Sequence, residues 1–193
     1  LGATDLGLLY PLVVVPIGIV GASNGFNMLA GYNGLEAGMG LIMISSIGLV
    51  SYLTGTVHVA MICAITAAVL TSFLIFNWYP AKIFPGNGFT YMIGGIIACA
   101  SILANVERLA IILFIPYFID LLLKAKSKMK AEAFAEVDSN GFLKNPYNGY
   151  YALPHVVIDF IIKMKGKTNE REVVIFIFLI EALLALIGMS LYI

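Results

Sequence analysis

Three asparagines stand within ten residues of one another in the segment NGFNMLAGYNGLEAGMG, with glycines among them. They are Asn24, Asn27 and Asn33. Asn24 and Asn27 are three residues apart, which places them on one face at the end of a helix. Amide groups can bind a hard cation or hydrogen-bond a base and a phosphate, and glycines let a ligand approach the backbone. The same composition is also typical of a helix end followed by a turn, so spacing alone leaves both interpretations open.

A second polar segment, NWYPAKIFPGNGFTYMIGG, begins at Asn77. Its FPGNGF portion, which starts at Phe84, predicts a turn that opens a helix. Backbone N–H groups at a helix start favour an anion such as a phosphate. The aromatic residues Trp78 and Tyr79 are equally well explained by the belt found at membrane interfaces.

The composition indicates that both segments belong to a membrane protein. Hydrophobic residues make up 61% of the 193 residues and charged residues only 11%, and the mean hydropathy is +0.97. Soluble domains contain about 25% charged residues, so lipid must cover part of this chain. The net charge is zero and no basic tract points to a nucleic-acid partner. We expect a single membrane domain over residues 1–193.

Six apolar stretches predict about six transmembrane helices, and hence an all-α, polytopic helical bundle. Crossing the hydrocarbon takes about 20 residues, and a backbone in lipid must satisfy its own hydrogen bonds. Pro11, Pro16 and Pro116 are expected to kink their helices. The stretches are residues 6–23, 37–53, 56–76, 89–104, 109–123 and 173–193.

The basic residues predict which side the loops face. Of 11 Lys and Arg residues, ten lie in the loops 77–88 and 124–172, and only Arg108 lies on the opposite side. The positive-inside rule therefore places the loops after the first, third and fifth helices in the cytosol. These three polar loops should meet at one face of the membrane.

The longest loop, residues 124–172, contains a predicted hairpin at DSNGFL and an amphipathic segment, residues 152–163, suited to the interface. His155 is the only histidine of this loop and is a candidate for a sugar or phosphate contact. A structural histidine at a helix start is the alternative.

Three acids lie within or at the ends of the predicted helices. Glu181 is near the middle of the last helix, where an ionisable residue is a functional hypothesis by default. It could equally pair with a polar group from another part of the protein. Asp120 lies about one turn from the cytosolic end of its helix, and Glu36 is expected to orient the first loop.

Together, NGFNMLAGYNGLEAG and NWYPAKIFPGNGFTYMIGG resemble the polyprenyl-phosphate N-acetylhexosamine-1-phosphate transferase superfamily. The form LAGYNGLEAG is similar to its eukaryotic and archaeal branch, the UDP-GlcNAc–dolichyl-phosphate GlcNAc-1-phosphotransferases. The resemblance implies that GlcNAc-1-phosphate moves from UDP-GlcNAc to a polyprenyl or dolichyl phosphate and that UMP leaves. It also implies a Mg²⁺ cofactor, with Mn²⁺ as a substitute, and a cytosol-facing site in the cell membrane or the endoplasmic reticulum.

The resemblance further implies roles for individual residues. Asn27 and Asn87 match metal ligands and, with His155, are the expected catalytic residues. Asn33 matches the residue that hydrogen-bonds uracil, and Phe84 matches the aromatic ring that stacks on it. The other expected substrate-binding residues are Asn24, Leu29, Gly31, Glu36 and Asp120. The loop 124–172 is expected to recognise the sugar.

Two features depart from the family pattern. Asn87 stands where most members carry an Asp, and a neutral amide binds metal more weakly than a carboxylate. Asp120 is a candidate for the missing charge. The chain also holds no Asp-Asp pair, a motif of the family's N-terminal half. We therefore expect a C-terminal portion of a longer transferase, completed by its N-terminal half or a second copy.

These departures keep a non-catalytic or degenerate homologue open as an alternative function, one that binds nucleotide sugar or partner helices. A small transporter is the third class considered. The predicted helices contain few paired charges at mid-depth, which disfavours it.

Overall fold

The structure is a computed structural model that describes residues 7–193. It is a helical bundle, and its only strands in this range form one small hairpin. The helices are α1 (Val15–Met28), α2 (Leu35–Leu53), α3 (Val57–Asn77), α4 (Asn87–Leu103), α5 (Glu107–Leu113), α6 (Ile115–Lys126), α7 (Leu153–Lys165) and α8 (Glu170–Met189), and a π-helical segment (Tyr10–Val14) leads into α1. The hairpin pairs β1 (Glu136–Val137) with β2 (Leu143–Lys144). The all-α membrane architecture predicted from the sequence is confirmed.

Four helices of the described residues are long and apolar enough to cross a membrane: Tyr10–Met28, α2, α3 and α8. Helix α4 is also apolar but shorter. The first predicted stretch begins at Leu6, which lies outside the described residues. Its helix continues to Met28, five residues beyond the predicted end, so Asn24 and Asn27 lie within α1.

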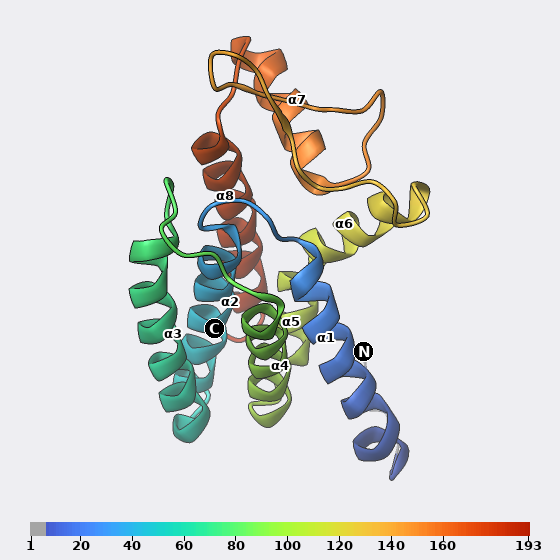
Figure 1. The fold of residues 1–193 in the computed structure, drawn as a ribbon. Helices are drawn as coiled ribbons and strands as arrows, with labels where there is room; N and C mark the ends of the chain where they lie inside the picture. The colour runs from blue at the N-terminus through green and yellow to red at the C-terminus, as the bar shows by residue number, and fades with distance from the viewer. Residues whose placement is uncertain (1–6) are drawn as a thin grey trace.

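The fifth predicted helix is wrong as a single span. It is divided at Phe114 into α5 and α6, and Pro116 lies in the first turn of α6. Proline lacks the N–H that would continue the hydrogen-bond ladder, so the helix ends and restarts there. Helix α6 then turns away from the bundle towards its edge (Figure 1).

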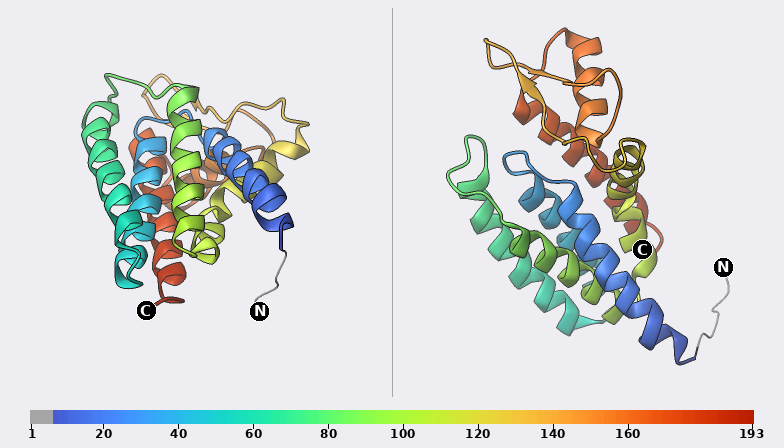
Figure 2. Two further views of the ribbon diagram at one scale, coloured as in Figure 1. Left: turned by 90° about the horizontal axis from the view of Figure 1, so that it is seen from below. Right: turned by 45° about the vertical axis from the view of Figure 1, so that its right-hand side comes forward.

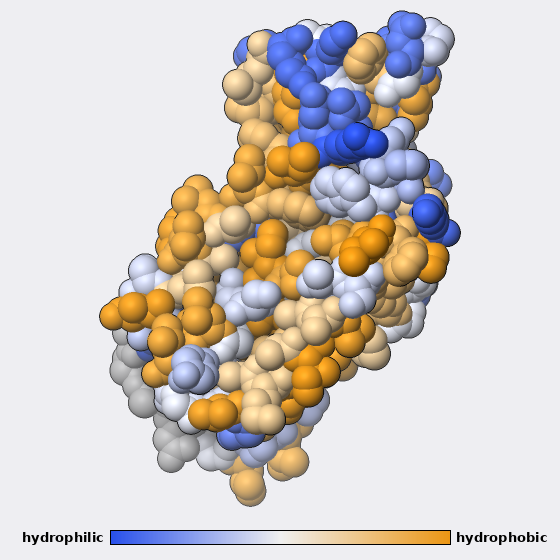
Figure 3. Space-filling model, turned by 90° about the vertical axis from the view of Figure 1, so that its left-hand side faces the viewer, coloured by the Kyte–Doolittle hydropathy of each residue, from blue (hydrophilic) through white to orange (hydrophobic). Residues whose placement is uncertain are grey.

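Three connections lie at the same end of the bundle, as the charge pattern predicts. They are the loop α1–α2, the loop α3–α4 and the long segment from α6 through α7 to α8 (Figure 1). Figure 2 shows α3 on one flank of the bundle and α1 with α6 on the other. Hydrophilic residues gather at the α7 end, and hydrophobic residues cover most of the helical body on the face drawn in Figure 3.

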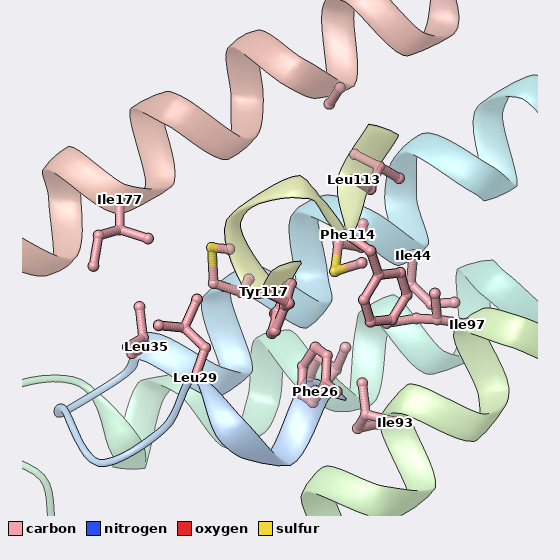
Figure 4. Packing of buried hydrophobic residues seen from close by; sticks show 14 of the residues in the cluster. Phe26, Leu29, Leu35, Ile44, Ile93, Ile97, Leu113, Phe114, Tyr117 and Ile177 are labelled. Carbon is pink, nitrogen blue, oxygen red and sulfur yellow. The ribbon is translucent and has the colours of Figure 1, made fainter. Parts of the chain in front are cut away.

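The core joins residues from most of the helices. Side chains of α1, α2, α4, α6 and α8 meet there, among them Phe26, Ile44, Ile93, Tyr117 and Ile177 (Figure 4). Phe26 stacks on Tyr117 with ring centroids 5.4 Å apart. Because the ends of α1, α2 and α4 are fixed by this core, the polar loops beyond them start from fixed positions.

Candidate functional site

The two polar segments singled out in the sequence meet at one end of the bundle. The Oδ1 atom of Asn33 accepts a hydrogen bond from the backbone N–H of Ala81 at 3.0 Å. The Thr90 hydroxyl lies 2.5 Å from Oδ1 of Asn27 and 3.0 Å from the backbone carbonyl of Asn87. The first contact joins the loop α1–α2 to the loop α3–α4, and the second joins α1 to α4. Together, Asn27, Asn33, Ala81, Asn87 and Thr90 form the polar surface.

The turn around Gly31 has a conformation that favours glycine. Its φ is +107°, and a Cβ there would stand 2.7 Å from Cε1 of Phe134. The N–H of Gly31 donates to Oε1 of Glu36 at 2.9 Å. Glu36 is buried in the first turn of α2, so it orients this loop as the sequence predicts.

The segment before the β1–β2 hairpin packs on the loop α1–α2, because Ala133 contacts Tyr32 and Phe134 contacts Gly31. The hydroxyl of Tyr32 donates to the carbonyl of Ala133 at 2.9 Å, and both residues are buried. Burial, and then the negative charge of Glu170, raise the pKa of Tyr32 above its ordinary value. The phenol thus stays neutral and acts as a hydrogen-bond donor.

Phe84 and Asn87 remain open to a ligand. The Phe84 side chain is 63% exposed, and Asn87 is exposed as the first residue of α4. An exposed ring beside a polar surface can stack on a planar base. Leu29 differs from the prediction, since the residue is 1% exposed and packs in the core. Its burial closes both its side chain and its backbone to a substrate in this structure.

The start of α8 supplies two residues that the sequence reasoning missed. Oε1 of Glu170 accepts from the backbone N–H of Asn33 at 2.6 Å and from its Nδ2 at 2.7 Å. The guanidinium of Arg171 lies 4.8 Å from the ring centre of Tyr79 and within 3.5 Å of its carbonyl. The NERE sequence signals a helix N-terminus, as a capping box, but gives no sign of these distant partners.

Asp120 and Asn24 lie on the α1–α6 side of the site. Oδ1 of Asp120 accepts from the N–H of Leu153 at 2.8 Å, and its Oδ2 lies 2.9 Å from Lys124 Nζ. Lys124 also donates to the carbonyl of Met28. The carboxylate of Asp120 is thus already paired, and it joins α6 to α1 and α7. The Nδ2 of Asn24 donates to Val20 O, 2.8 Å away in its own helix.

His155 is enclosed in the first turn of α7. Its side chain is fully buried, and neither ring nitrogen has a hydrogen-bond partner among residues 7–193. Tyr147 packs against the ring with centroids 5.4 Å apart. Burial lowers the pKa of His155, which favours the neutral imidazole. A sugar contact by this side chain would require the covering segment to open.

An apolar cavity of about 700 Å³ runs between α1, α4, α5 and α6. Asn24, Gly25 and Met28 line one part of it, close to the polar surface, and the rest is almost entirely apolar. Its size and lining suit a hydrocarbon chain rather than a nucleotide.

The chain's own donors do not by themselves fit a magnesium site. Asn27 and Asn87 offer neutral amide oxygens, and no group of three or more His, Cys, Asp or Glu in residues 7–193 is placed to hold a metal ion. Mg²⁺ usually takes one or two carboxylates together with substrate phosphates. The negative charge for such an ion must therefore come from elsewhere.

Comparisons with known proteins found a family profile and several relatives that match this chain. The profile of glycosyl transferase family 4 matches residues 1–105. Two archaeal proteins that this chain resembles are provisionally named UDP-N-acetylglucosamine–dolichyl-phosphate N-acetylglucosaminephosphotransferases. The one from Saccharolobus solfataricus is 39% identical over 99% of this chain, and the one from Sulfolobus acidocaldarius is 36% identical over 97% of it.

A bacterial relative is similar over a shorter region. The phospho-N-acetylmuramoyl-pentapeptide-transferase of Halalkalibacterium halodurans is 39% identical over 56% of this chain and 33% of its own length. The chain spans 58% and 56% of the length of the two archaeal relatives.

Proposed function

The chain belongs to glycosyl transferase family 4, and on this premise we propose that it is part of an enzyme that transfers GlcNAc-1-phosphate from UDP-GlcNAc to a polyprenyl phosphate such as dolichyl phosphate. An oxygen of the lipid phosphate attacks the β-phosphorus of UDP-GlcNAc. The bond from that phosphorus to the bridging oxygen breaks, and UMP leaves with the bridging oxygen. The product begins a lipid-linked glycan of the kind used in protein N-glycosylation or in the cell envelope.

The observation that carries this proposal is the hydrogen bond between Asn33 and Ala81. It joins the loop proposed to hydrogen-bond uracil to the turn that carries Phe84, the ring proposed to stack on it. A base placed on Phe84 would then meet the Asn33 carboxamide at its edge. Gly31, in the same loop, is held in its turn by Glu36 and covered by Phe134.

We assign the diphosphate of UDP-GlcNAc to the part of the polar surface around Asn27 and Asn87, away from Asn33. The Thr90 hydroxyl contacts the Asn27 side chain and the backbone carbonyl of Asn87 there, and Asn87 is exposed as the first residue of α4, where the positive end of the helix favours an anion. A magnesium ion bound there would be held mainly by the substrate's phosphates, with Asn27 and Asn87 adding neutral oxygens. The ion would neutralise charge on the diphosphate as UMP leaves.

The apolar cavity between α1 and α6 is the proposed place for the lipid acceptor. It reaches the polar surface at Asn24 and Met28, so a phosphate at the cavity mouth would lie near the ends of α1 and α4. The basic residues of the loop 124–172 favour a cytosolic orientation of this face.

The proposal is tested with membranes that contain the natural protein. They are incubated with UDP-GlcNAc, a polyprenyl phosphate and Mg²⁺, and both UMP release and lipid-linked GlcNAc are measured. Asn33→Ala and Asn27→Ala should each lower UMP release by about 10²-fold or more, in the range of lost positioning contacts. Thr71→Ala, at an exposed position of α3, is the control and should retain the wild-type rate. Unchanged UMP release in the first two variants would refute the site.

A further inference from the structure

Both ends of the Asn33 carboxamide are engaged by groups that fix its orientation. Nδ2 donates to Oε1 of Glu170 at 2.7 Å, and Oδ1 accepts from the N–H of Ala81 at 3.0 Å. A carboxylate only accepts hydrogen bonds and a backbone N–H only donates. The nitrogen of the amide must therefore face Glu170, and the oxygen must face Ala81.

Glu170 is itself held on a well-capped helix. The Asn169 side chain accepts from the Glu172 N–H, and the Glu172 side chain accepts from the Asn169 N–H, both at 3.1 Å. Oε1 of Glu170 additionally accepts from the backbone N–H of Asn33 at 2.6 Å. Since the carboxylate binds both the backbone and the side chain of Asn33, it restrains this residue at two points.

The fixed amide keeps one N–H and one oxygen lone pair for a ligand. Uracil presents a carbonyl oxygen beside a ring N–H, so it pairs with the amide as it stands. Cytosine presents an amino group beside a ring acceptor, which requires the amide nitrogen and oxygen to be exchanged. The other cytosine edge offers only acceptors, and therefore a shift of the base does not restore two hydrogen bonds.

We propose that Glu170 is a positioning residue that holds the Asn33 carboxamide in the orientation that selects uracil over cytosine. A reversed amide would set Oδ1 against the Glu170 carboxylate and Nδ2 against the Ala81 N–H. Both contacts would be repulsive. The inference rests on the proposed function, because it assumes that a nucleotide base meets Asn33.

The test measures binding of UMP and of CMP to the purified natural protein in detergent. Glu170→Ala should lower the preference for UMP over CMP by at least about tenfold, which corresponds to one hydrogen bond to a charged group. Glu170→Gln keeps a neutral acceptor and should give an intermediate preference, since hydrogen bonds to neutral groups are about half as strong. Glu136→Ala removes an exposed Glu of the hairpin and should leave the preference unchanged.

The outcomes separate this inference from the proposed function. A wild-type protein that binds neither nucleotide contradicts the proposed function itself. A wild-type protein that prefers UMP, with a Glu170→Ala variant that loses affinity for both nucleotides equally, shows a merely structural role and overturns the inference. Should Glu170→Ala fail to fold, Glu170→Gln decides: an intermediate preference supports the positioning role, and an unchanged one overturns it.

Discussion

Gly94→Ala should lower the proposed transferase activity by about 10²-fold, because it separates α1 from α4. Gly94 lies in α4, one turn after Thr90, and it packs directly on the α1 backbone. A Cβ at this position would stand 2.6 Å from Ala22 O and 2.8 Å from Ser23 Cα. Backbone atoms of a packed helix cannot rotate aside as a side chain can, so the two helices must move apart.

The size of the movement follows from the contact distances. Ordinary van der Waals contact begins at 3.4 Å, so a contact of 2.6 Å must lengthen by about 0.8 Å. Such overpacking costs about 1–3 kcal/mol of stability. The displacement would draw Asn27 on α1 away from Thr90 and Asn87 on α4. A misplacement of about 1 Å near reacting groups can lower a rate by about 10²-fold.

The assay is UMP release from UDP-GlcNAc by membranes that carry equal amounts of folded protein. Gly95→Ala is the matched control, since a Cβ at Gly95 meets only the flexible Ser23 Oγ at 3.3 Å. We expect a loss of about 10²-fold for Gly94→Ala and less than about threefold for Gly95→Ala. Equal activities of the two variants would refute the argument that helix approach at Gly94 sets the site.

Three further predictions concern single side chains. Both carboxylate oxygens of Glu181 are buried without a hydrogen-bond partner in the part of the chain that the structure describes, so Glu181→Leu should stabilise the protein by about 1 kcal/mol or more and raise its Tm; a lower Tm would contradict this reasoning. Asn87→Asp should reduce the Mg²⁺ concentration for half-maximal UMP release by about tenfold, whereas Asn148→Asp should leave it unchanged. The same magnesium dependence in both variants would contradict the placement of Asn87 beside the diphosphate. Burial lowers the pKa of His155 from its ordinary 6.5, so the unfolded chain binds more protons and stability should fall as the pH drops below about 6.5. His155→Phe should abolish this part of the pH dependence of Tm, and an unchanged profile would contradict it.

Hydrophobic length and charge placement predicted the helices well, because lipid imposes strong constraints on both. The predicted third stretch, residues 56–76, differs from α3 by one residue at each end. The hairpin at Asp138 was also predictable: Gly141 has a φ of +79°, and Asp138 accepts the N–H groups of Asn140 and Phe142. The break at Phe114 was not, since an apolar sequence with one proline fits a kinked span as well as two helices.

The residues of the site were predictable only in part. Asn27 and Asn33 stood out because asparagines and glycines gather there between apolar stretches, whereas the role of Phe84 was implied only by the family resemblance. Glu170 did not, because an acid in the first turn of a helix is explained by the helix dipole alone. Its bond to Asn33 joins residues 137 positions apart, and no local pattern records such a pairing.

The sequence by itself determined that this chain is a helical membrane protein whose three polar loops share one face. Its apolar stretches must satisfy their backbone in lipid, and ten of its 11 Lys and Arg residues gather in loops that lie on the same predicted side. The tertiary structure decided which polar groups are free to meet a ligand. Packing of α8 against α2 brings Glu170 to Asn33, and the core encloses Leu29. The N–H of Leu153 at the start of α7 binds Asp120. These contacts join residues far apart in the sequence, which residue type and spacing do not specify, whereas the ion pair of Asp120 with Lys124 lies within α6 at a four-residue spacing.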